Sequence, residues 1–295
     1  MLVLILSFFS LLIIRHTELE EAARDSLSFA ARSLIPALFP FAVLSRFVLT
    51  ASLLPCRDKL SQTVAKALHL QASVLPAYCL GLFCGFPIGA YAAASLWEAV
   101  LCDGRYAQRS ASLANNASAA FLFGTAASLF GNSRAAVILF VSQTTATLLV
   151  SVLSNKNSHV EQPTVMLSES PSYLSLAADA VSKAGLAMLS LSAFVVFFAV
   201  LTKALLFAGV PEWVTLFLEP TSAVRYAANL APQIGLPLSL SFASLALGWS
   251  GLSVILQAQA LFKGTLPLSL QIPCRAAIAL VSFTITFLFS FLFLN

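Results

Sequence analysis

The chain consists mainly of long apolar runs separated by short groups of charged residues. A helix needs about 20 apolar residues to cross roughly 30 Å of hydrocarbon. Four uncharged runs have about that length, namely 110–133, 135–155, 184–202 and 276–295. The pattern therefore predicts that each of these runs crosses a membrane once.

Two further uncharged runs, 67–97 and 226–262, are longer than one crossing requires and contain proline and glycine. Non-helical backbone at membrane depth is tolerated only where protein or water satisfies its polar groups. We therefore expect both runs to be broken or re-entrant. In the first run, Gly85-Phe-Pro-Ile-Gly89 favours a hairpin tip over a kink in an ordinary span. A leucine at Gly89 is then expected to harm function more than folding.

Self-comparison of the chain indicates a duplication, which is common in transporters. Phe41-Ala-Val-Leu-Ser-Arg46 resembles Phe198-Ala-Val-Leu-Thr-Lys203, Gly85-Phe86 pairs with Gly248-Trp249, and Asp103-Gly104 pairs with Lys263-Gly264. We expect repeats at 27–153 and 182–295, separated by a polar loop at 154–181. The repeats are inverted if 72–97 re-enters the membrane and parallel if it crosses, and we favour inversion.

The N-terminal segment, residues 1–14, is apolar but has neither the preceding basic residues nor the cleavage site of a signal peptide. We expect a retained anchor helix followed by a polar linker, so that the pair covers 1–26.

Composition supports a membrane environment, since 59% of the 295 residues are hydrophobic and 9% are charged. Soluble domains have roughly 25% charged residues, so this chain cannot cover itself with polar surface. The net charge of +4 is spread along the loops, which favours a lipid bilayer as partner and not a nucleic acid. The five cysteines lie mostly in apolar segments without paired histidines, so we expect no disulfide, metal or other cofactor.

Polar residues inside the apolar runs are the candidate binding groups, because burying them in hydrocarbon is costly without a partner. Asn115 and Asn116, beside Ser118, are the clearest pair. They fall between helix-like runs, so they could bind a ligand or cap a broken helix. Alternatively they hold helices together by hydrogen bonds, and the sequence does not choose between these roles.

Three other positions carry open alternatives. Glu219, followed by Thr221 and Ser222, is either a helix cap or a carboxylate that binds a cation, a proton or a ligand hydroxyl. Gln257 and Gln259 cannot face the same direction on one helix, and we favour Gln257 for the site. Arg275 either faces inward, where it would favour an anionic solute, or reaches the lipid headgroups.

The order of short motifs resembles the nucleoside-recognition, or Gate, family, in its YlbJ-like sporulation membrane branch. The motifs are Leu34-Ile-Pro-Ala-Leu-Phe-Pro-Phe-Ala-Val-Leu44, Gly85-Phe-Pro-Ile-Gly-Ala90, Asn115-Asn-Ala-Ser118, Leu218-Glu-Pro-Thr-Ser222, and Gly248-Trp-Ser-Gly-Leu-Ser253 with Gln257. The resemblance implies a fold similar to the core of concentrative nucleoside transporters. It also implies handling of a small anion, dipicolinic acid, at a membrane around the forespore. Gly248-Trp-Ser-Gly and Glu-Pro-Thr-Ser depart from the family pattern.

Enzyme signatures are incomplete in this chain. Asp103-Gly-Arg-Tyr-Ala-Gln-Arg109 is similar to the opening of CDP-alcohol phosphotransferases, but 110–133 lacks the aspartates that their metal chemistry requires. There is no His-Glu-x-x-His motif and no phosphate-binding loop ending in Lys-Ser/Thr. We therefore expect a non-enzymatic protein of the bacterial cell membrane or of a membrane that surrounds the forespore. A homo-oligomer is compatible with the sequence.

The sequence thus predicts an all-α polytopic membrane transporter or channel for a small polar solute such as an organic anion. A nucleoside-type transporter and a non-transporting sporulation scaffold are the alternatives. The expected substrate site lies between the repeats. It is formed by Gly85, Pro87, Gly89, Asn115, Asn116, Ser118, Glu219, Thr221, Ser222, Gly248, Ser250, Gly251, Ser253, Gln257 and Arg275.

Overall fold

The computed structural model describes residues 10, 13–51, 58–154 and 172–293. Within these residues every regular element is a helix and no strand occurs. Five helical stretches in this part of the chain are long and apolar enough to cross a membrane: His16–Thr50, Ser133–Leu153, Tyr173–Phe207, Leu236–Leu261 and Leu268–Phe293. The protein is therefore all-α, as expected, and its apolar helices fit a membrane-embedded chain.

The first stretch is continuous over α2 (His16–Phe29), η1 (Ala30–Leu34) and α3 (Ile35–Thr50). The segment expected to be a polar linker up to residue 26 is thus helical from His16 onward. The anchor helix expected at 1–14 falls almost entirely outside the described residues. The short α4 (Lys59–Ala67) follows, and Asp58 begins it by accepting a hydrogen bond from the backbone N–H of Ser61.

The next elements are η2 (Ala72–Val74), α5 (Leu75–Phe83) and α6 (Ile88–Glu98). Gly81 and Gly89 pack together, because a Cβ built on Gly89 would lie 2.5 Å from the Cα of Gly81. Residues eight apart in a straight helix are separated by about 12 Å, so the chain must reverse at Gly85–Pro87. The expected hairpin is confirmed. Gly89, however, lies in the first turn of α6 and not in the break.

A second departure from helix follows α7 (Gly104–Leu113). Backbone 114–118 is non-helical, and the chain becomes helical again through η3 (Phe121–Ala126) and α8 (Ala127–Phe130). The expectation that 110–133 crosses as one helix is therefore wrong. Asn115 and Asn116 lie in the break, and asparagine is a poor helix former because its side chain competes for backbone hydrogen bonds. The half ends with α9 (Ser133–Leu153).

The second half begins with the long α10 (Tyr173–Phe207), so the loop expected up to residue 181 is helical from Tyr173. Then come η4 (Glu212–Val214), α11 (Thr215–Leu218), α12 (Pro220–Ile234), α13 (Leu236–Trp249), α14 (Gly251–Leu261) and α15 (Leu268–Phe293). The run 226–262 is broken, as expected, at Gly235 (φ 83°) and at Ser250 and Gly251 (φ 65° and 74°).

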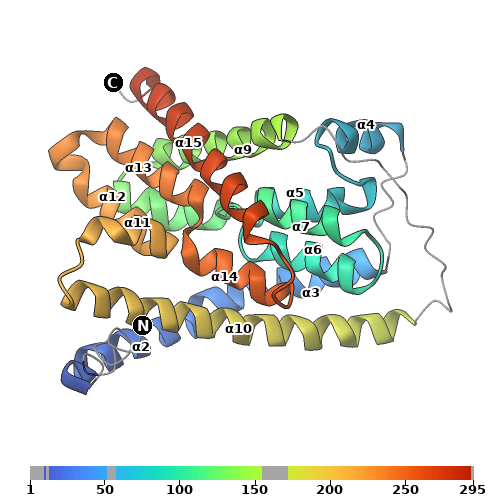
Figure 1. Ribbon diagram of the computed structural model, residues 1–295, viewed down its shortest axis with the longest axis horizontal. Coiled ribbons are helices and arrows are strands. Elements are labelled where there is room, and N and C mark those ends of the chain that lie inside the picture. Colours follow the sequence, from blue (N-terminus) through green and yellow to red (C-terminus); the bar gives the residue numbers. More distant parts are fainter. Residues whose placement is uncertain (1–9, 11–12, 52–57, 155–171, 294–295) are drawn as a thin grey trace.

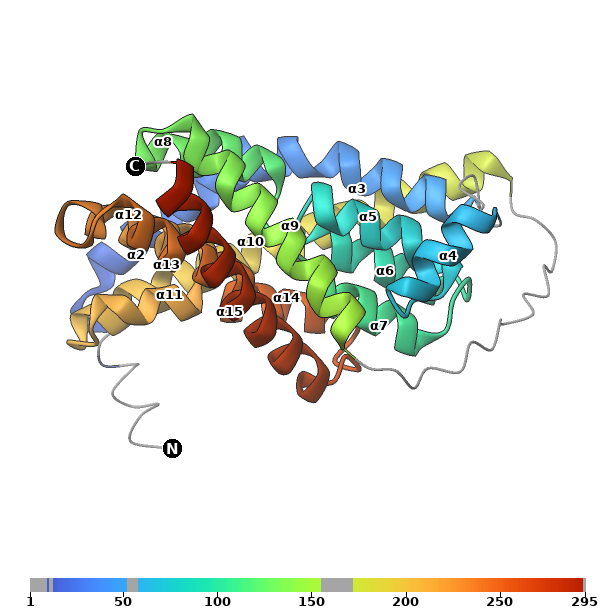
Figure 2. The same ribbon diagram turned by 90° about the horizontal axis from the view of Figure 1, so that it is seen from above.

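In space, α10 lies along one side of the molecule, packed beside α2 and α3 (Figure 1). On another side α9 and α15 cross the molecule together (Figure 2). The hairpin and the broken helices lie between these long helices. Small residues allow close approach: Gly248 of α13 faces α15 so closely that a Cβ there would lie 2.6 Å from the Cα of Ala279.

Candidate functional site

The tip of the α5–α6 hairpin packs directly on the break that follows α7. The backbone N–H of Phe86 donates to the carbonyl oxygen of Asn116 at 2.6 Å. A Cβ at Gly85, whose φ is +73°, would lie 2.3 Å from the backbone nitrogen of Ser118. Pro87 is buried beside it, and the Phe86–Pro87 peptide bond is cis. The two non-helical segments of the first half therefore form one buried unit.

The side chain of Asn116 is buried within this unit, with 1% of its surface exposed. Its Oδ1 accepts a hydrogen bond from Thr147 of α9 at 3.0 Å and lies 3.5 Å from Nη1 of Arg275. Its Nδ2 has no partner among the described residues, and neither has Oδ1 of the buried Asn115. The pair thus presents both a donor and an acceptor that are unused.

Arg275, in the first third of α15, is also buried, with 2% of its surface exposed. Its Nη1 donates to the carbonyl of Leu113 at 3.2 Å, and its Nη2 donates to the carbonyl of Leu247 at 3.3 Å. These carbonyls belong to the C-terminal ends of α7 and α13. The alternative in which Arg275 reaches the lipid headgroups is therefore wrong. The helix ends, with their partial negative charge, hold the guanidinium inside.

No carboxylate in the described part of the chain forms an ion pair with Arg275. Its Nε has no hydrogen-bond partner there either. A buried cation with an unused donor in an otherwise uncharged helix is unusual, because desolvating the charge is costly.

The break between α13 and α14 begins at Ser250, three residues after Leu247, whose carbonyl oxygen binds Arg275. Ser250, Gly251 and Ser253 are buried there. A Cβ on Gly251 would lie 2.9 Å from the carbonyl oxygen of Leu218, so this break packs against the α11–α12 connection. No side chain caps the start of α14.

Glu219 forms the α11–α12 connection and acts as the N-cap of α12. Its two carboxylate oxygens accept hydrogen bonds from the backbone N–H groups of Thr221 at 3.0 Å and Ser222 at 2.7 Å. Of the two interpretations of this glutamate, the contacts match the helix cap. Thr221 and Ser222 contribute backbone groups to it.

Gln257 and Gln259 face different surroundings, as their spacing predicts. Gln257 is buried and its Oε1 has no partner among the described residues, whereas the amide of Gln259 donates to the carbonyl of Leu266. In the described part of the chain no hydrogen bond joins Gln257 to Asn116 or Arg275. It lies two turns beyond the break at Ser250.

The structure therefore links the hairpin tip, the Asn115–Asn116 break, Arg275 and the end of α13 in one chain of contacts. Sequence reasoning missed two members of α9. Thr147 binds Asn116, and Nε2 of Gln143 donates to the carbonyl of Leu247 at 3.3 Å. Their spacing of four residues within an uncharged run was the available signal.

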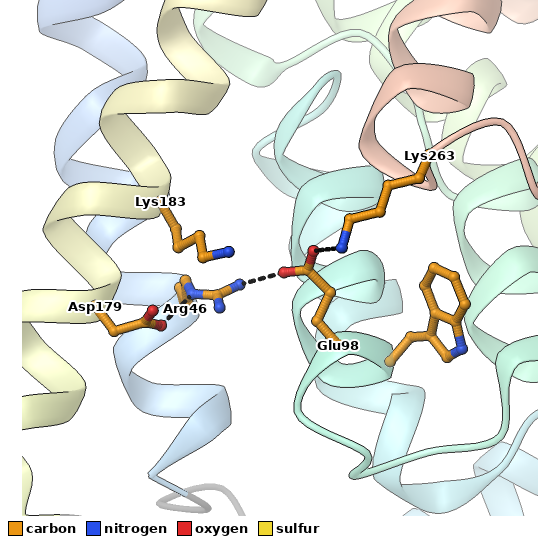
Figure 3. A pocket seen from close by; sticks show the side chains of 6 residues that line it. Arg46, Glu98, Asp179, Lys183 and Lys263 are labelled. Atoms are coloured by element: carbon orange, nitrogen blue, oxygen red, sulfur yellow. Dashed lines mark hydrogen bonds and ion pairs between the residues drawn. The ribbon is translucent and has the colours of Figure 1, made fainter.

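Sequence reasoning also missed a second polar site, a pocket of about 420 Å³. It is lined by Arg46 of α3, Trp97 and Glu98 of α6, Asp179 and Lys183 of α10, and Lys263 just after α14 (Figure 3). Arg46 Nε donates to Asp179 at 2.9 Å and Nη1 lies 3.2 Å from Glu98, which also pairs with Lys263 at 3.0 Å.

No grouping of histidine, cysteine, aspartate and glutamate suited to a metal ion occurs in the described residues. Comparison with models of known protein families, with curated proteins and with solved structures finds no match.

Proposed function

We propose that this protein carries a small polar solute, best matched by an organic anion, through a site formed by its two helix breaks and Arg275. The observation that supports it most is the buried guanidinium of Arg275, which has no carboxylate partner in the described residues. Intramembrane charges are costly, and where they occur they commonly mark a solute pathway.

The unused groups define the chemistry of the proposed ligand. The ends of α7 and α13 each carry a partial charge of about −0.5, which offsets much of the charge of Arg275. What remains are two donors, Nε of Arg275 and Nδ2 of Asn116, and one acceptor, Oδ1 of Asn115. A carboxylate would take the two donors, and a hydroxyl or ring N–H of the same solute would bind Asn115.

The element order supports the proposed inverted repeats. His16–Thr50 and Tyr173–Phe207 are both 35 residues long. Each is followed by two short helices joined at a proline, which are α5 and α6 at Pro87 and α11 and α12 at Pro220. An interrupted helix and a long final helix come next, with α9 and α15 as the final helices. This order pairs Phe41 with Phe198, as the sequence match does. It pairs Pro87 with Pro220, however, and the Asn115–Asn116 break with Ser250. Gly248 then corresponds to the end of α7 and not to Gly85.

Inversion would follow from the hairpin, because η2 with α5 has 12 residues and α6 has 11. Each arm is about 16–18 Å long and is too short to cross roughly 30 Å of hydrocarbon. If the interrupted segment from α7 to α8 crosses once, a hairpin that enters and leaves on one side leaves three crossings before the second repeat, namely His16–Thr50, the α7–α8 segment and α9. An odd number of crossings inverts the second repeat.

The direct test is uptake of radiolabelled solutes into proteoliposomes containing the purified chain. We expect uptake of an aromatic dicarboxylate such as dipicolinate, which the sequence resemblance implies, and none of it in liposomes without protein. Uptake of nucleosides alone would instead support the neutral-solute alternative. If neither class is taken up, the protein is better interpreted as a membrane scaffold.

Two asparagine variants separate binding from folding. Asn115→Leu should abolish uptake without lowering the unfolding temperature, because the Oδ1 that it removes has no partner. Asn116→Leu should reduce both uptake and the unfolding temperature. It removes the oxygen that accepts the hydrogen bond of Thr147 and that lies beside Arg275. Normal uptake by Asn115→Leu and Asn116→Leu would place the substrate site elsewhere.

A further inference from the structure

We propose that the pocket between α3, α6, α10 and the end of α14 is a second site, which binds a small oxyanion such as a carboxylate or a phosphate group. This inference does not depend on the proposed transport function. It rests on the pocket, its ion pairs and the donors left unused inside it (Figure 3).

The charges that line the pocket do not balance. Arg46, Lys183 and Lys263 are cationic, whereas only Glu98 and Asp179 are acidic. Glu98 already pairs with two of the cations, and Asp179 pairs with Arg46. One positive charge is therefore in excess, and a bound monoanion would neutralise it.

Two donors remain available for such an anion. Lys183 forms no ion pair in the described part of the chain, and its side chain extends toward the space beside Arg46 and Glu98 (Figure 3). Arg46 uses Nε for Asp179 and Nη1 for Ser95 and Glu98, which leaves Nη2 without a partner among the described residues. An oxyanion beside Lys183 and Arg46 would receive charge-assisted hydrogen bonds from both.

Burial gives the pocket a closed base and an open mouth. The Arg46 side chain is 7% exposed, whereas those of Asp179 and Lys263 are 44% and 69% exposed. A guanidinium held in a partly desolvated base attracts an anion more strongly than a surface lysine does, because water screens it less. The volume of about 420 Å³ suits a small molecule or a headgroup.

The lengths of α6 and α14 locate the pocket relative to the helix breaks. α6 and α14 each have 11 residues, so each extends about 16 Å from its break to the pocket. This distance is about half of the hydrocarbon thickness, which places the pocket near one membrane surface if the breaks lie at the centre. Trp97 and Phe262 stack at 5.6 Å and join the ends of the two helices there.

The experiment measures thermal unfolding of the full chain in neutral detergent, with benzoate or inorganic phosphate replacing chloride at constant ionic strength. We expect both probes to raise the unfolding temperature in a saturable way. Lys183→Gln should weaken the apparent affinity about tenfold. The matched control is Lys203→Gln, which removes an exposed lysine of the same helix outside the pocket and should change nothing.

A variant that is expected to tighten binding distinguishes a loss of the site from a general loss of folding. Asp179→Asn removes a negative charge and releases Nε of Arg46, so it should tighten binding several-fold. The absence of any shift with either probe, or equal weakening by Lys183→Gln and Lys203→Gln, would overturn the proposal. So would weaker binding in Asp179→Asn, because the pocket would then be a closed salt-bridge network.

The source of the oxyanion is distinguished in nanodiscs. If the natural occupant is a lipid headgroup, adding phosphatidylglycerol to phosphatidylcholine discs should raise the unfolding temperature of the unmodified chain and abolish the effect of free phosphate. If it is a soluble anion, lipid composition should leave the benzoate and phosphate effects unchanged.

Discussion

Nη1 of Arg275 lies 3.5 Å from Oδ1 of Asn116, although 159 positions separate the two residues. The same guanidinium bonds the ends of α7 and α13, so one side chain joins both broken helices. This arrangement makes Arg275 a structural link as well as a candidate ligand group, and the two roles predict different effects of substitution.

Arg275→Lys keeps the charge but not the planar fork. A lysine ammonium is a single point, so it cannot reach the carbonyls of Leu113 and Leu247 together. We expect the variant to lose about 1–3 kcal/mol of stability, because a buried acceptor is left unsatisfied, and to lose uptake. Denaturant unfolding in detergent measures the first effect. Arg134→Lys, an exposed position at the start of α9, is the control, and equal stability of both variants would contradict the linking role.

Gly89→Ala tests the close packing of the hairpin. The added Cβ would lie 2.5 Å from the Cα of Gly81 and 2.7 Å from the carbonyl oxygen of Ala114, both backbone atoms. We expect a loss of about 1–3 kcal/mol from this overpacking. We therefore expect a substitution at Gly89 to damage folding directly, whereas the sequence alone predicted more harm to function than to folding.

Gly185→Ala provides the matched control for Gly89→Ala. Gly185 is also helical, but nothing lies within 4 Å of a Cβ built there. Alanine should be neutral or stabilise α10 by about 0.5–1 kcal/mol, because glycine costs that much in a helix. If the two alanine variants unfold at the same temperature, the hairpin is looser than the structure indicates.

The breaks at glycine and proline could be predicted from the sequence, because these residues have few ways to continue a helix. The hairpin at Gly85–Pro87 and the turn at Ser250–Gly251 both followed this rule. The break at Asn115–Asn116 was considered only as a possible cap, because the uncharged run 110–133 was long enough for one crossing helix. Asparagine disfavours helix less strongly than proline or glycine does. The contacts of Asn116 with Phe86 and Arg275 come from segments that are distant in the sequence.

The direction of Arg275 could not be predicted for a related reason. An arginine at the start of a span reaches the lipid headgroups unless carbonyl groups or carboxylates inside the protein bind it. The carbonyls of Leu113 and Leu247, which bind Arg275, belong to segments that are far away in the sequence. The charged pocket has the same origin. Its residues come from three helices and the turn after α14, so no local pattern brings Arg46 to Lys183 or Lys263.

Glu98 makes stability depend on pH. Burial opposes its ionisation, but the hydrogen bond and charge of Lys263, with the charges of Arg46 and Lys183, outweigh burial and hold the pKa of Glu98 below its ordinary value of 4.5. A lowered folded-state pKa means that the stabilisation is present above the unfolded-state value and disappears as the pH falls through the folded-state value.

We therefore expect the unfolding temperature to decrease below about pH 4.5 more steeply in the unmodified chain than in Glu98→Gln. The measurement is a series of thermal unfolding curves in detergent between pH 7 and pH 3. Parallel curves for the two proteins would show that the ion pairs with Arg46 and Lys263 do not contribute to stability.

Glu219 offers the last test, because its capping role and its charge can be separated. Asparagine is as good an N-cap as aspartate, so Glu219→Asn can bond the N–H groups of α12 without a charge, whereas Glu219→Ala removes cap and charge together. We expect Glu219→Asn to keep nearly normal stability and uptake, since both oxygens of the glutamate are already used by Thr221 and Ser222. Glu219→Ala should lose about 1 kcal/mol. If Glu219→Asn instead folds normally but fails to transport, the carboxylate itself binds a coupling cation or proton, and the cap is only its resting contact.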